Sequence, residues 1–370
     1  MIVKSLKLKN YRNYDLLNLE FDECTNIFYG DNAQGKTNIL ESVYLTGTTK
    51  SPRGTKDRDL IKFGQEEAHI ETIVEKRGVP FKIDIHLKKN SPKGIAINKI
   101  PIKRASELFG IINIVFFSPE DLNIIKNGPA ERRRFMDLEL AQLDKVYLND
   151  LSNYNRIVNQ RNKLLKDMYD RKDLLETLDV WDIQLVTYGN RVMERRKLFI
   201  KQMNEIIGNV HEKLTGGKER IELIYEAGIK NDNFEDALLR NRERDMRMKS
   251  TSVGPHRDDI CFMCGDMDIR RFGSQGQQRT AALSLKLAEI ELVKQEINDT
   301  PILLLDDVLS ELDKHRQNYL LDSIRDIQTL ITCTGVDDFV NKRFSINKIL
   351  KVEQGHVISN VKPQSAFFEG

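Results

Sequence analysis

The stretch that could do chemistry most directly is Gly30-Asp31-Asn32-Ala33-Gln34-Gly35-Lys36-Thr37. It matches the phosphate-loop pattern G-x-x-x-x-G-K-[ST] at every fixed position. Glycines let backbone N–H groups close around phosphate oxygens, and a lysine at this position can hold the β- and γ-phosphates of a nucleotide. The hydroxyl of Thr37 would then bind magnesium, so this phosphate loop predicts a site for ATP and Mg²⁺. The predicted ATP-binding residues of this stretch are Gly30, Asp31, Asn32, Ala33, Gln34, Gly35, Lys36, Thr37 and Asn38.

Two carboxylates much later in the chain can complete this chemistry. The run Pro301-Ile302-Leu303-Leu304-Leu305 is apolar and ends at Asp306 and Asp307. A buried parallel strand presents such groups at its C-terminal end, where nucleotide sites of α/β sheets lie. We expect Asp306 to hold magnesium, directly or through water, and Asp307 to face the attacking water. The expected catalytic pair is therefore Lys36 and Asp307.

A second set of phosphate-directed donors is Ser274, Gln275, Gly276 and Gln277, at the start of a helix predicted over 280–297. A serine hydroxyl, backbone N–H groups and the positive end of the helix dipole all favour an anion there. We call these four residues the signature motif.

The elements that must position these residues also follow from the pattern. An apolar run over 26–29 leads into the phosphate loop as a strand, and residues 38–43 lead out of it as a helix. A glycine-rich turn that binds no ligand would not require a strand before it and a helix after it. Alternating residues over 2–8, 68–74 and 81–87 predict strands with one wet face, and the apolar run 111–117 predicts a buried strand.

Arg12 lies between two aromatic residues in Asn10-Tyr11-Arg12-Asn13-Tyr14. One interpretation is the polar end of a strand. The other is a platform beside the phosphate loop, where Arg12 or a tyrosine meets the adenine. The sequence leaves both open, and Arg12 is kept as a candidate ATP-binding residue.

Residues 131–249 have the character of a helical lobe. Apolar residues from Tyr147 to Met168 and from Trp181 to Ile206 recur at four-three spacing, interrupted by Arg161 and Arg195 respectively. Two such seams, separated by a charged turn at 170–173, predict an antiparallel helical hairpin. Two ordinary bundle helices would explain the pattern equally well.

The composition restricts the class of protein. The chain has 370 residues, and its hydrophobic content of 40% with 31% charged residues is that of a charge-rich globular protein. No stretch approaches the roughly 20 apolar residues of a membrane span, so we expect a cytoplasmic protein. Cys261 and Cys264 form a C-x-x-C pair, but a structural zinc site needs four ligands and no second pair lies nearby.

The net charge of +2 is too small to indicate nucleic acid by itself. Basic residues nevertheless cluster within 88–104, 132–134 and 240–249. Solvated turns explain them adequately, but they are also candidate contacts to phosphates. Nothing resembles a base-reading helix or an aromatic platform for single strands, so binding to double-stranded DNA would be electrostatic and indifferent to sequence.

The motifs taken in order carry a resemblance. The phosphate loop, the signature motif, the carboxylates at 306 and 307, and Ser310-Glu311-Leu312-Asp313 resemble ABC-type ATPase heads. Finer stretches resemble the RecF family of bacterial recombination mediators, related to SMC heads, over nearly the whole chain. These stretches are the one around Arg12, Phe117-Ser118-Pro119-Glu120-Asp121-Leu122, Gly254-Pro255-His256-Arg257-Asp258-Asp259 and the eight residues from Gly273 to Thr280.

The resemblance implies an α/β fold: an ABC-type P-loop ATPase head over 1–130 and 250–370, with a helical lobe inserted over 131–249. It implies a cytoplasmic DNA-repair ATPase with weak, DNA-stimulated activity that forms an ATP-dependent homodimer. In that dimer the signature motif would meet the γ-phosphate bound to the partner. The family resemblance further implies binding to double-stranded DNA at gap junctions, and work with RecO and RecR to load RecA on SSB-coated single strands.

Two positions depart from the wider ABC pattern. Asp307 stands where transporter heads usually have glutamate, and Cys333-Thr334 stands where they usually have histidine. Both departures predict slow hydrolysis that acts as a timer. The ATPase subunit of a transporter would not need the helical lobe. A chromosome ATPase of the SMC type would need a longer coiled coil. A non-hydrolysing, nucleotide-controlled DNA clamp remains the other alternative.

Overall fold

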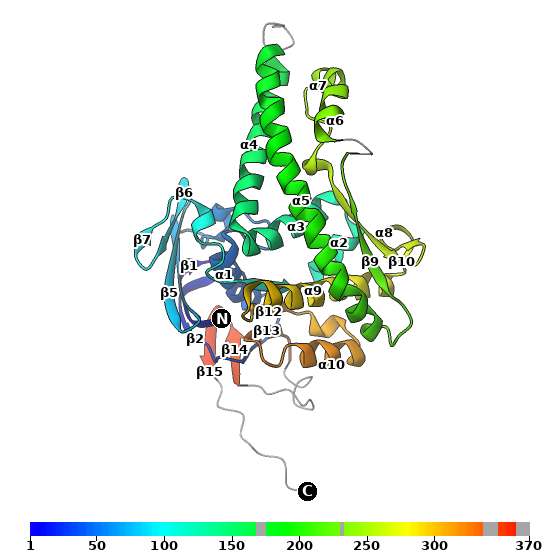
Figure 1. Ribbon diagram of the computed structural model, residues 1–370. Helices are drawn as coiled ribbons and strands as arrows, with labels where there is room; N and C mark the ends of the chain where they lie inside the picture. Colours follow the sequence, from blue (N-terminus) through cyan, green and yellow to red (C-terminus); the bar gives the residue numbers. More distant parts are fainter. Residues whose placement is uncertain (168–174, 230–232, 336–346, 360–370) are drawn as a thin grey trace. The chain divides into compact units, whose positions relative to one another are not determined.

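The computed structural model describes residues 1–167, 175–229, 233–335 and 347–359 (Figure 1). The chain forms two compact units. The first unit comprises Met1–Glu120 and Glu289–Gly370, and the second unit comprises Asp121–Ala288. These boundaries differ from the predicted division at residues 131 and 250. The reason is that helix α2 (Leu122–Lys126), strand β10 (Asp259–Cys264) and the start of helix α9 (Gln275–Ile297) pack with the other elements of the second unit.

A mostly parallel sheet of six strands carries the centre of the first unit. Its strand order is β15-β14-β3-β13-β12-β8, and only the pair of β14 with β15 is antiparallel. Residues 302–306 of β12 are buried throughout, as expected for a parallel strand covered on both faces. The strands are β3 (Thr25–Tyr29), β8 (Ile114–Phe117), β12 (Ile302–Asp306), β13 (Thr329–Cys333), β14 (Lys348–Glu353) and β15 (His356–Ser359).

A second, antiparallel sheet of the first unit has the strand order β2-β1-β4-β5-β6-β7. Leu6 and Leu8 of β1 are buried, whereas Lys7 and Lys9, which alternate with them along the strand, are exposed. The alternation in the sequence therefore gives one dry face. The strands are β1 (Ile2–Tyr11), β2 (Tyr14–Glu20), β4 (Glu67–Lys76), β5 (Val79–Lys88), β6 (Ser91–Ile97) and β7 (Ile100–Pro101).

Helix α1 (Lys36–Thr48) follows β3 directly across the phosphate loop. It contacts β4 of the antiparallel sheet as well as β8, β12 and β13 of the parallel sheet. Nearly all of its residues are consequently buried, including Ile39, Leu40 and Val43. Helix α10 (Lys314–Ser323) begins where the Asp313 side chain accepts a hydrogen bond from the backbone of Arg316.

The second unit is mainly helical, with a small antiparallel sheet of order β11-β10-β9. Its elements are α2 (Leu122–Lys126), α3 (Pro129–Leu143), α4 (Lys145–Asp167), α5 (Leu175–Leu214), β9 (Ile221–Glu226), α6 (Phe234–Arg240), α7 (Arg242–Met248), β10 (Asp259–Cys264), β11 (Met267–Asp268) and α8 (Ile269–Phe272). Helix α9 (Gln275–Ile297) begins in this unit and ends in the first one.

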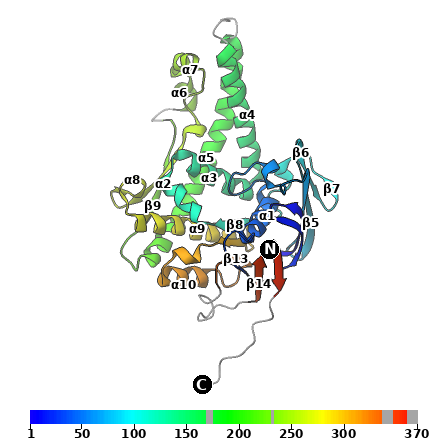
Figure 2. The ribbon, with the colours of Figure 1, turned by 180° about the vertical axis from the view of Figure 1, so that it is seen from behind.

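Helices α4 and α5 run antiparallel and lie side by side in both views (Figures 1 and 2). Tyr147 near the start of α4 contacts Arg196 of α5, whereas Arg161 near the end of α4 contacts Asp182. With 40 residues, α5 is about 60 Å long at a rise of 1.5 Å per residue. The charged turn predicted at 170–173 lies outside the described residues.

The polar interruptions of the predicted seams have partners in the structure. Arg161 is fully buried, and its guanidinium donates to Asp182 at 2.6 Å and to Asp245 at 2.7 Å. Arg195 is exposed and pairs with Asp144, while its neighbour Arg196 is the buried residue. Each seam therefore carries an ion pair where the apolar pattern breaks.

The described residues include neither a membrane-spanning helix nor a cluster of three or more metal-ligating side chains. No helix within them is long and apolar enough to cross a bilayer. In the same part of the chain, no group of three or more His, Cys, Asp or Glu residues is arranged to hold a metal ion. Cys261 is buried against Met263, and this burial raises the pKa of its thiol to about 11.

Candidate nucleotide-binding site

The phosphate loop connects the C-terminal end of β3 to the first turn of α1. Gly30 and Gly35 have φ values of 149° and 112°, in the region that favours glycine. A Cβ atom on Gly30 would lie 2.3 Å from the carbonyl oxygen of Val352, and one on Gly35 would lie 2.4 Å from Asn13 Nδ2. The loop therefore needs glycine at both fixed positions for its own packing, before any phosphate is considered.

Asn13 and Tyr14 hold the loop from the neighbouring hairpin, a role that the sequence did not predict. Asn13 Nδ2 donates to the carbonyl of Gln34 at 2.9 Å, and Asn13 Oδ1 accepts from Asn38 Nδ2 at 2.8 Å. The hydroxyl of Tyr14 donates to the carbonyl of Gly35 at 3.1 Å. Two of these bonds engage carbonyls of the loop and the third holds the side chain of Asn38, so the hairpin fixes both the loop and the start of α1.

The ammonium group of Lys36 folds back onto the same loop. It donates to the carbonyls of Gly30 and Asp31, the latter at 3.0 Å, and the residue is only 5% exposed. Among the described residues no carboxylate lies within ion-pair distance of this ammonium. A nearly buried positive charge held by neutral oxygens suits an anionic ligand, because such a charge is stabilised when it gains an opposite partner.

Asp306 ends β12 beside the phosphate loop, next to the other predicted magnesium ligand. Its Oδ1 accepts from the Thr37 hydroxyl at 2.7 Å and from the Thr332 hydroxyl at 2.8 Å. Its Oδ2 lies 3.8 Å from the guanidinium of Arg53, which is partly exposed. The residue itself is 7% exposed, so a nearly buried carboxylate has mainly neutral hydroxyl donors. A carboxylate and a hydroxyl are the oxygen ligands that Mg²⁺ prefers, and these residues therefore fit the ion.

Asp307 has an unusual backbone for an aspartate, with a φ of 53°. Its N–H donates to Thr332 Oγ1 at 3.0 Å, and its carbonyl accepts from the hydroxyl of Ser310 at 2.7 Å. Burial raises the pKa of the Asp307 carboxyl and Asp306 raises it further, while the Lys36 charge acts in the opposite direction. A left-handed non-glycine residue costs about 1–3 kcal/mol, and such strain clusters at functional sites.

Thr332 is a further residue of this site that the sequence did not predict. Its one hydroxyl donates to Asp306 and accepts from the backbone of Asp307, so it holds the carboxylate of Asp306 and the backbone of Asp307. The signal available in the sequence was the apolar run ending in Thr332-Cys333, which forms β13 beside β12. Nothing in that run identifies which hydroxyl faces its neighbouring strand.

Arg12 packs against Glu41 of helix α1 and does not lie on an open platform. Its guanidinium makes two 2.9 Å hydrogen bonds to Glu41, which is fully buried, and a 3.1 Å bond to Thr55. Tyr11 and Tyr14 are both 0% exposed, so neither ring offers a face to an adenine in this structure. Of the predicted platform, only the Arg12 side chain retains an exposed part, 21%.

The signature motif lies in the second unit, at the start of α9. The helix begins at Gln275, five residues before the predicted start, because Ser274 and Gln277 cap it reciprocally. The Ser274 N–H donates to Gln277 Oε1 at 2.9 Å, and the Gln277 N–H donates to Ser274 Oγ at 3.2 Å. Ser274, Gln275 and Gly276 are exposed.

The structure reduces the set of basic candidates for DNA contacts. Arg132 is 4% exposed and makes two bonds to Asp259, so it cannot reach a phosphate on the surface. Arg242 pairs with Asp179 and Asp182. Arg244 and Arg247 of the same cluster are exposed. These positions correct the prediction for Arg132 and weaken it for Arg242.

Comparisons with known sequences agree with these motifs. A family model described as the RecF/RecN/SMC N terminal domain matches residues 2–357. The DNA replication and repair protein RecF of Agathobacter rectalis is 62% identical over 357 residues, which are 96% of this chain and 99% of the relative. The protein of the same name from Lachnospira eligens is 60% identical over 361 residues, covering 97% of this chain and 99% of the relative.

Solved structures give the same result. The recombination mediator protein RecF-ATP in the RecFOR pathway superposes with a TM-score of 0.90 at 34% identity, covering 97% of this chain and 98% of that one. An Smc head domain of Pyrococcus furiosus, bound to the C-terminal domain of ScpA, has a TM-score of 0.57 at 17% identity over 99% of this chain and 97% of that one. The second likeness concerns the fold alone.

Proposed function

Because the chain belongs to the RecF family, within the wider RecF/RecN/SMC N-terminal domain family, we propose that it is an ATP-dependent, DNA-binding recombination mediator. It dimerises on ATP and binds double-stranded DNA at gap junctions. With RecO and RecR it promotes loading of RecA on SSB-coated single strands. The support for the pathway is the likeness over nearly the whole chain to RecF structures described as part of the RecFOR pathway.

The observation that carries the nucleotide chemistry is the placement of Lys36, Thr37 and Asp306. Lys36 brings a nearly buried positive charge to the loop, and Thr37 and Asp306 bring two oxygen ligands into hydrogen-bond contact. When bound there, Mg²⁺ would supply charge neutralisation for the β- and γ-phosphates. Lys36 then holds those phosphates, while the loop N–H groups of residues 30–38 surround them.

Asp307 is the residue that we assign to the attacking water. Its carboxylate, raised in pKa by burial, accepts a proton more readily than an ordinary aspartate would. Aspartate is one methylene shorter than the glutamate of fast ABC ATPases, so the water is oriented less well. Slow hydrolysis then limits the lifetime of the ATP-bound dimer on DNA and acts as a timer.

The signature motif is assigned to the partner's nucleotide. Gln277 takes up the Ser274 backbone N–H, and the Ser274 hydroxyl accepts from Gln277 but still has its own proton to donate. This exposed hydroxyl and the helix start can meet a γ-phosphate presented by a second copy of the chain. ADP lacks that phosphate, so it does not support the dimer.

DNA binding is assigned to exposed basic residues that face solvent. Suitable positions are Lys99, Lys103 and Arg104 in the first unit and Arg244 and Arg247 in the second. Contacts from such residues go to phosphates, so the affinity falls steeply with salt and does not depend on sequence.

A non-hydrolysing clamp is the second candidate, and one observation favours it. Asp307 stands in place of a glutamate, and Cys333 and Thr334 supply no histidine near the γ-phosphate. In a clamp, ATP binding alone would control assembly. Single-turnover hydrolysis with and without DNA distinguishes the two, because the clamp would hydrolyse no ATP in either case.

Sedimentation velocity tests the proposed function most directly. We expect a monomer without nucleotide and with ADP, a dimer with ATP and Mg²⁺, and salt-sensitive binding of the dimer to duplex DNA. The variant Ser274→Arg should bind ATP like the parent protein yet stay monomeric, because the arginine obstructs the exposed start of α9. Equal dimerisation in all nucleotide states, or normal dimerisation of Ser274→Arg, would refute the assembly proposed here.

A further inference from the structure

We propose that Glu219 is a positioning residue for the signature motif, connecting the end of the long helix α5 to the group that meets the partner's nucleotide. Gln277 Nε2 donates to Glu219 Oε1 at 2.8 Å. Both residues belong to the second unit. The inference rests on the proposed function, since it concerns how that unit presents Ser274.

Gln277 is the member of the motif whose side chain is fully engaged. Its Oε1 accepts from the Ser274 backbone, and its Nε2 donates to Glu219. A glutamine amide oriented by only one of these bonds could rotate or flip, which would release the Ser274 backbone. The carboxylate fixes the amide orientation, because only the Nε2 side can donate to it.

Glu219 is itself held by the turn between α5 and β9. The Thr215 hydroxyl accepts from the Glu219 N–H at 3.2 Å, and its oxygen lies 2.9 Å from the carbonyl of His211 and 3.1 Å from that of Glu219. Gly216 and Gly217, with φ values of 64° and 79°, close the end of α5. The backbone that presents the carboxylate is thus tied to the last turn of a 40-residue helix.

His211 of the last turns of α5 lies behind the carboxylate. Its Nε2 is 3.6 Å from Glu219 Oε2. Its Nδ1 is 2.9 Å from the hydroxyl of Ser284, which lies further along α9 than Gln277. The imidazole is fully buried. Glu219 therefore has one oxygen toward the signature motif and the other toward the packed contact of α5 with α9.

The consequence is a physical route from the helical hairpin to the signature motif. A shift at the end of α5 moves Glu219, and with it the amide that caps Ser274. Through this contact a change on the helices, such as the binding of DNA, alters how well Ser274 is positioned to meet the partner's nucleotide.

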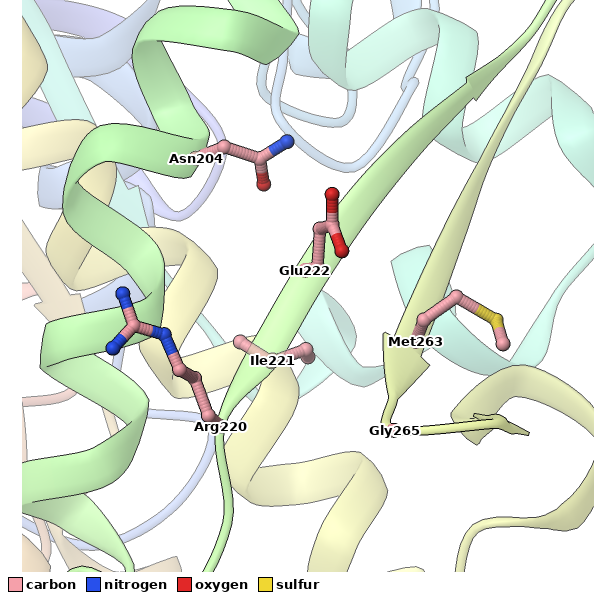
Figure 3. Close-up of a pocket in the computed structure, with 6 residues that line it drawn as sticks. All are labelled: Asn204, Arg220, Ile221, Glu222, Met263 and Gly265. Atoms are coloured by element: carbon pink, nitrogen blue, oxygen red, sulfur yellow. The ribbon is translucent and has the colours of Figure 1, made fainter.

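Glu222 provides a matched control on the same segment. It lies three residues further along, at the exposed face of β9, and lines a hollow together with Asn204, Arg220 and Met263 (Figure 3). The backbone of Glu222 pairs with β10, but its side chain makes no hydrogen bond or ion pair in the part of the chain that the structure describes. Glu222→Ala therefore removes the same side chain without touching Gln277.

The first experiment measures amide hydrogen exchange of the nucleotide-free monomer. In Glu219→Ala, exchange at Ser274 and Gln277 should be faster by about tenfold, since a charge-assisted bond that orients the cap is lost. Glu219→Gln retains an acceptor oxygen but gains donors and loses the charge, so its exchange should fall between that of the parent protein and that of Glu219→Ala. Glu222→Ala should not differ from the parent. Unchanged exchange at Ser274 in Glu219→Ala overturns the inference, whatever the protein does with ATP.

The second experiment is a double-mutant cycle on ATP-induced dimerisation, followed by sedimentation. Glu219→Ala should weaken the dimer about tenfold while leaving ATP affinity unchanged. In a Gln277→Ala background, the same change at 219 should have no further effect. Independent, additive effects would overturn the inference. If the parent protein fails to dimerise with ATP, the proposed function fails, and the exchange measurement still decides the role of Glu219.

Discussion

Buried charges occur in both units, but they are compensated in different ways. In the second unit, Arg161 has two carboxylates, and Arg196 contacts Asp258 at 2.8 Å and Asp137 at 2.7 Å. In the first unit, Lys36 has carbonyl partners alone, and Asp306 has two hydroxyls with one guanidinium at 3.8 Å.

This difference separates charges that hold a fold together from charges that await a ligand. A buried ion needs an opposite charge with good geometry, and the second unit supplies that charge from its own side chains. The first unit does the same for the fully buried Glu41, which pairs with Arg12. Its phosphate-loop site, in contrast, leaves a nearly buried cation and a nearly buried anion without close opposite partners, although both lie at one edge of a sheet. A phosphate and a divalent cation would supply what each lacks.

The largest expected effect lies in the compensated unit. Arg161→Ala leaves Asp245 buried without its charged partner and leaves Asp182 with Arg242 alone, so the free energy of unfolding of the second unit should fall by about 3–5 kcal/mol. ATP affinity of the folded protein should stay as in the parent. Chemical denaturation followed by Trp181 fluorescence, with ATP titration below the transition, measures both.

Arg195→Ala is the control for this prediction, because Arg195 is exposed and pairs with Asp144 at the surface. It should change the free energy of unfolding by less than about 1 kcal/mol. Equal effects of the two substitutions would show that burial does not distinguish these arginines.

The next effect is on the uncompensated cation. Lys36→Ala removes the charge that holds the phosphates, and ATP affinity should fall on the order of 100-fold. Because Lys36 makes no ion pair with a described residue, thermal stability without nucleotide should hardly change. Lys36→Arg keeps the charge and changes its geometry, so it should bind ATP while hydrolysing it poorly. Titration with a fluorescent ATP analogue tests this, and normal affinity of Lys36→Ala would remove the assignment.

The two neighbouring carboxylates should respond differently. Asp306→Asn weakens a magnesium ligand, so ATP affinity in the presence of Mg²⁺ should fall. Asp307→Asn keeps the shape but removes the proton acceptor, so ATP should bind at least as well while hydrolysis slows by up to about 100-fold. The ATP-bound dimer of Asp307→Asn should also persist longer on DNA. The comparison needs affinity, single-turnover rate and dimer lifetime for both variants, and identical behaviour would contradict the division of roles.

The pH dependence follows from the same carboxylate. Burial raises the pKa of Asp307 above its ordinary value of 3.8. Only the ionised carboxylate can accept a proton, so the single-turnover rate should fall as the pH is lowered through that raised pKa. The loss should begin at a higher pH than for an ordinary aspartate and should be absent in Asp307→Asn. A rate that is independent of pH in the acidic range would argue against the assignment.

The sequence predicted the α/β class and the ABC-type head, and the comparisons confirm both. It also predicted that Thr37 and Asp306 lie close together. A phosphate loop and an aspartate that ends an apolar strand both stand at C-terminal ends of strands, and these ends lie at one edge of a parallel sheet. It did not predict Asn13, Tyr14 or Thr332, whose roles depend on which strand is the neighbour. From periodicity alone Arg161 is an interruption of a seam, because periodicity does not show the opposite charges that other helices bring to it.

The smallest expected effect concerns the hydroxyl of Thr332, which supports the uncompensated carboxylates without touching a ligand. Thr332→Val has nearly the same shape but removes one of the two donors to Asp306 Oδ1 and the acceptor for the Asp307 N–H. Because an unmet buried hydrogen bond costs about 1–3 kcal/mol, we expect the single-turnover rate to fall about tenfold. ATP affinity in the presence of Mg²⁺ should fall less, since Thr37 still donates to Asp306. Thr332→Ser keeps the hydroxyl and should restore most of the rate, which separates the hydrogen bonds from the packing of the methyl group. If valine and serine behave alike, the hydroxyl does not orient the Asp306 carboxylate, and the left-handed backbone of Asp307 must be held by its other contacts.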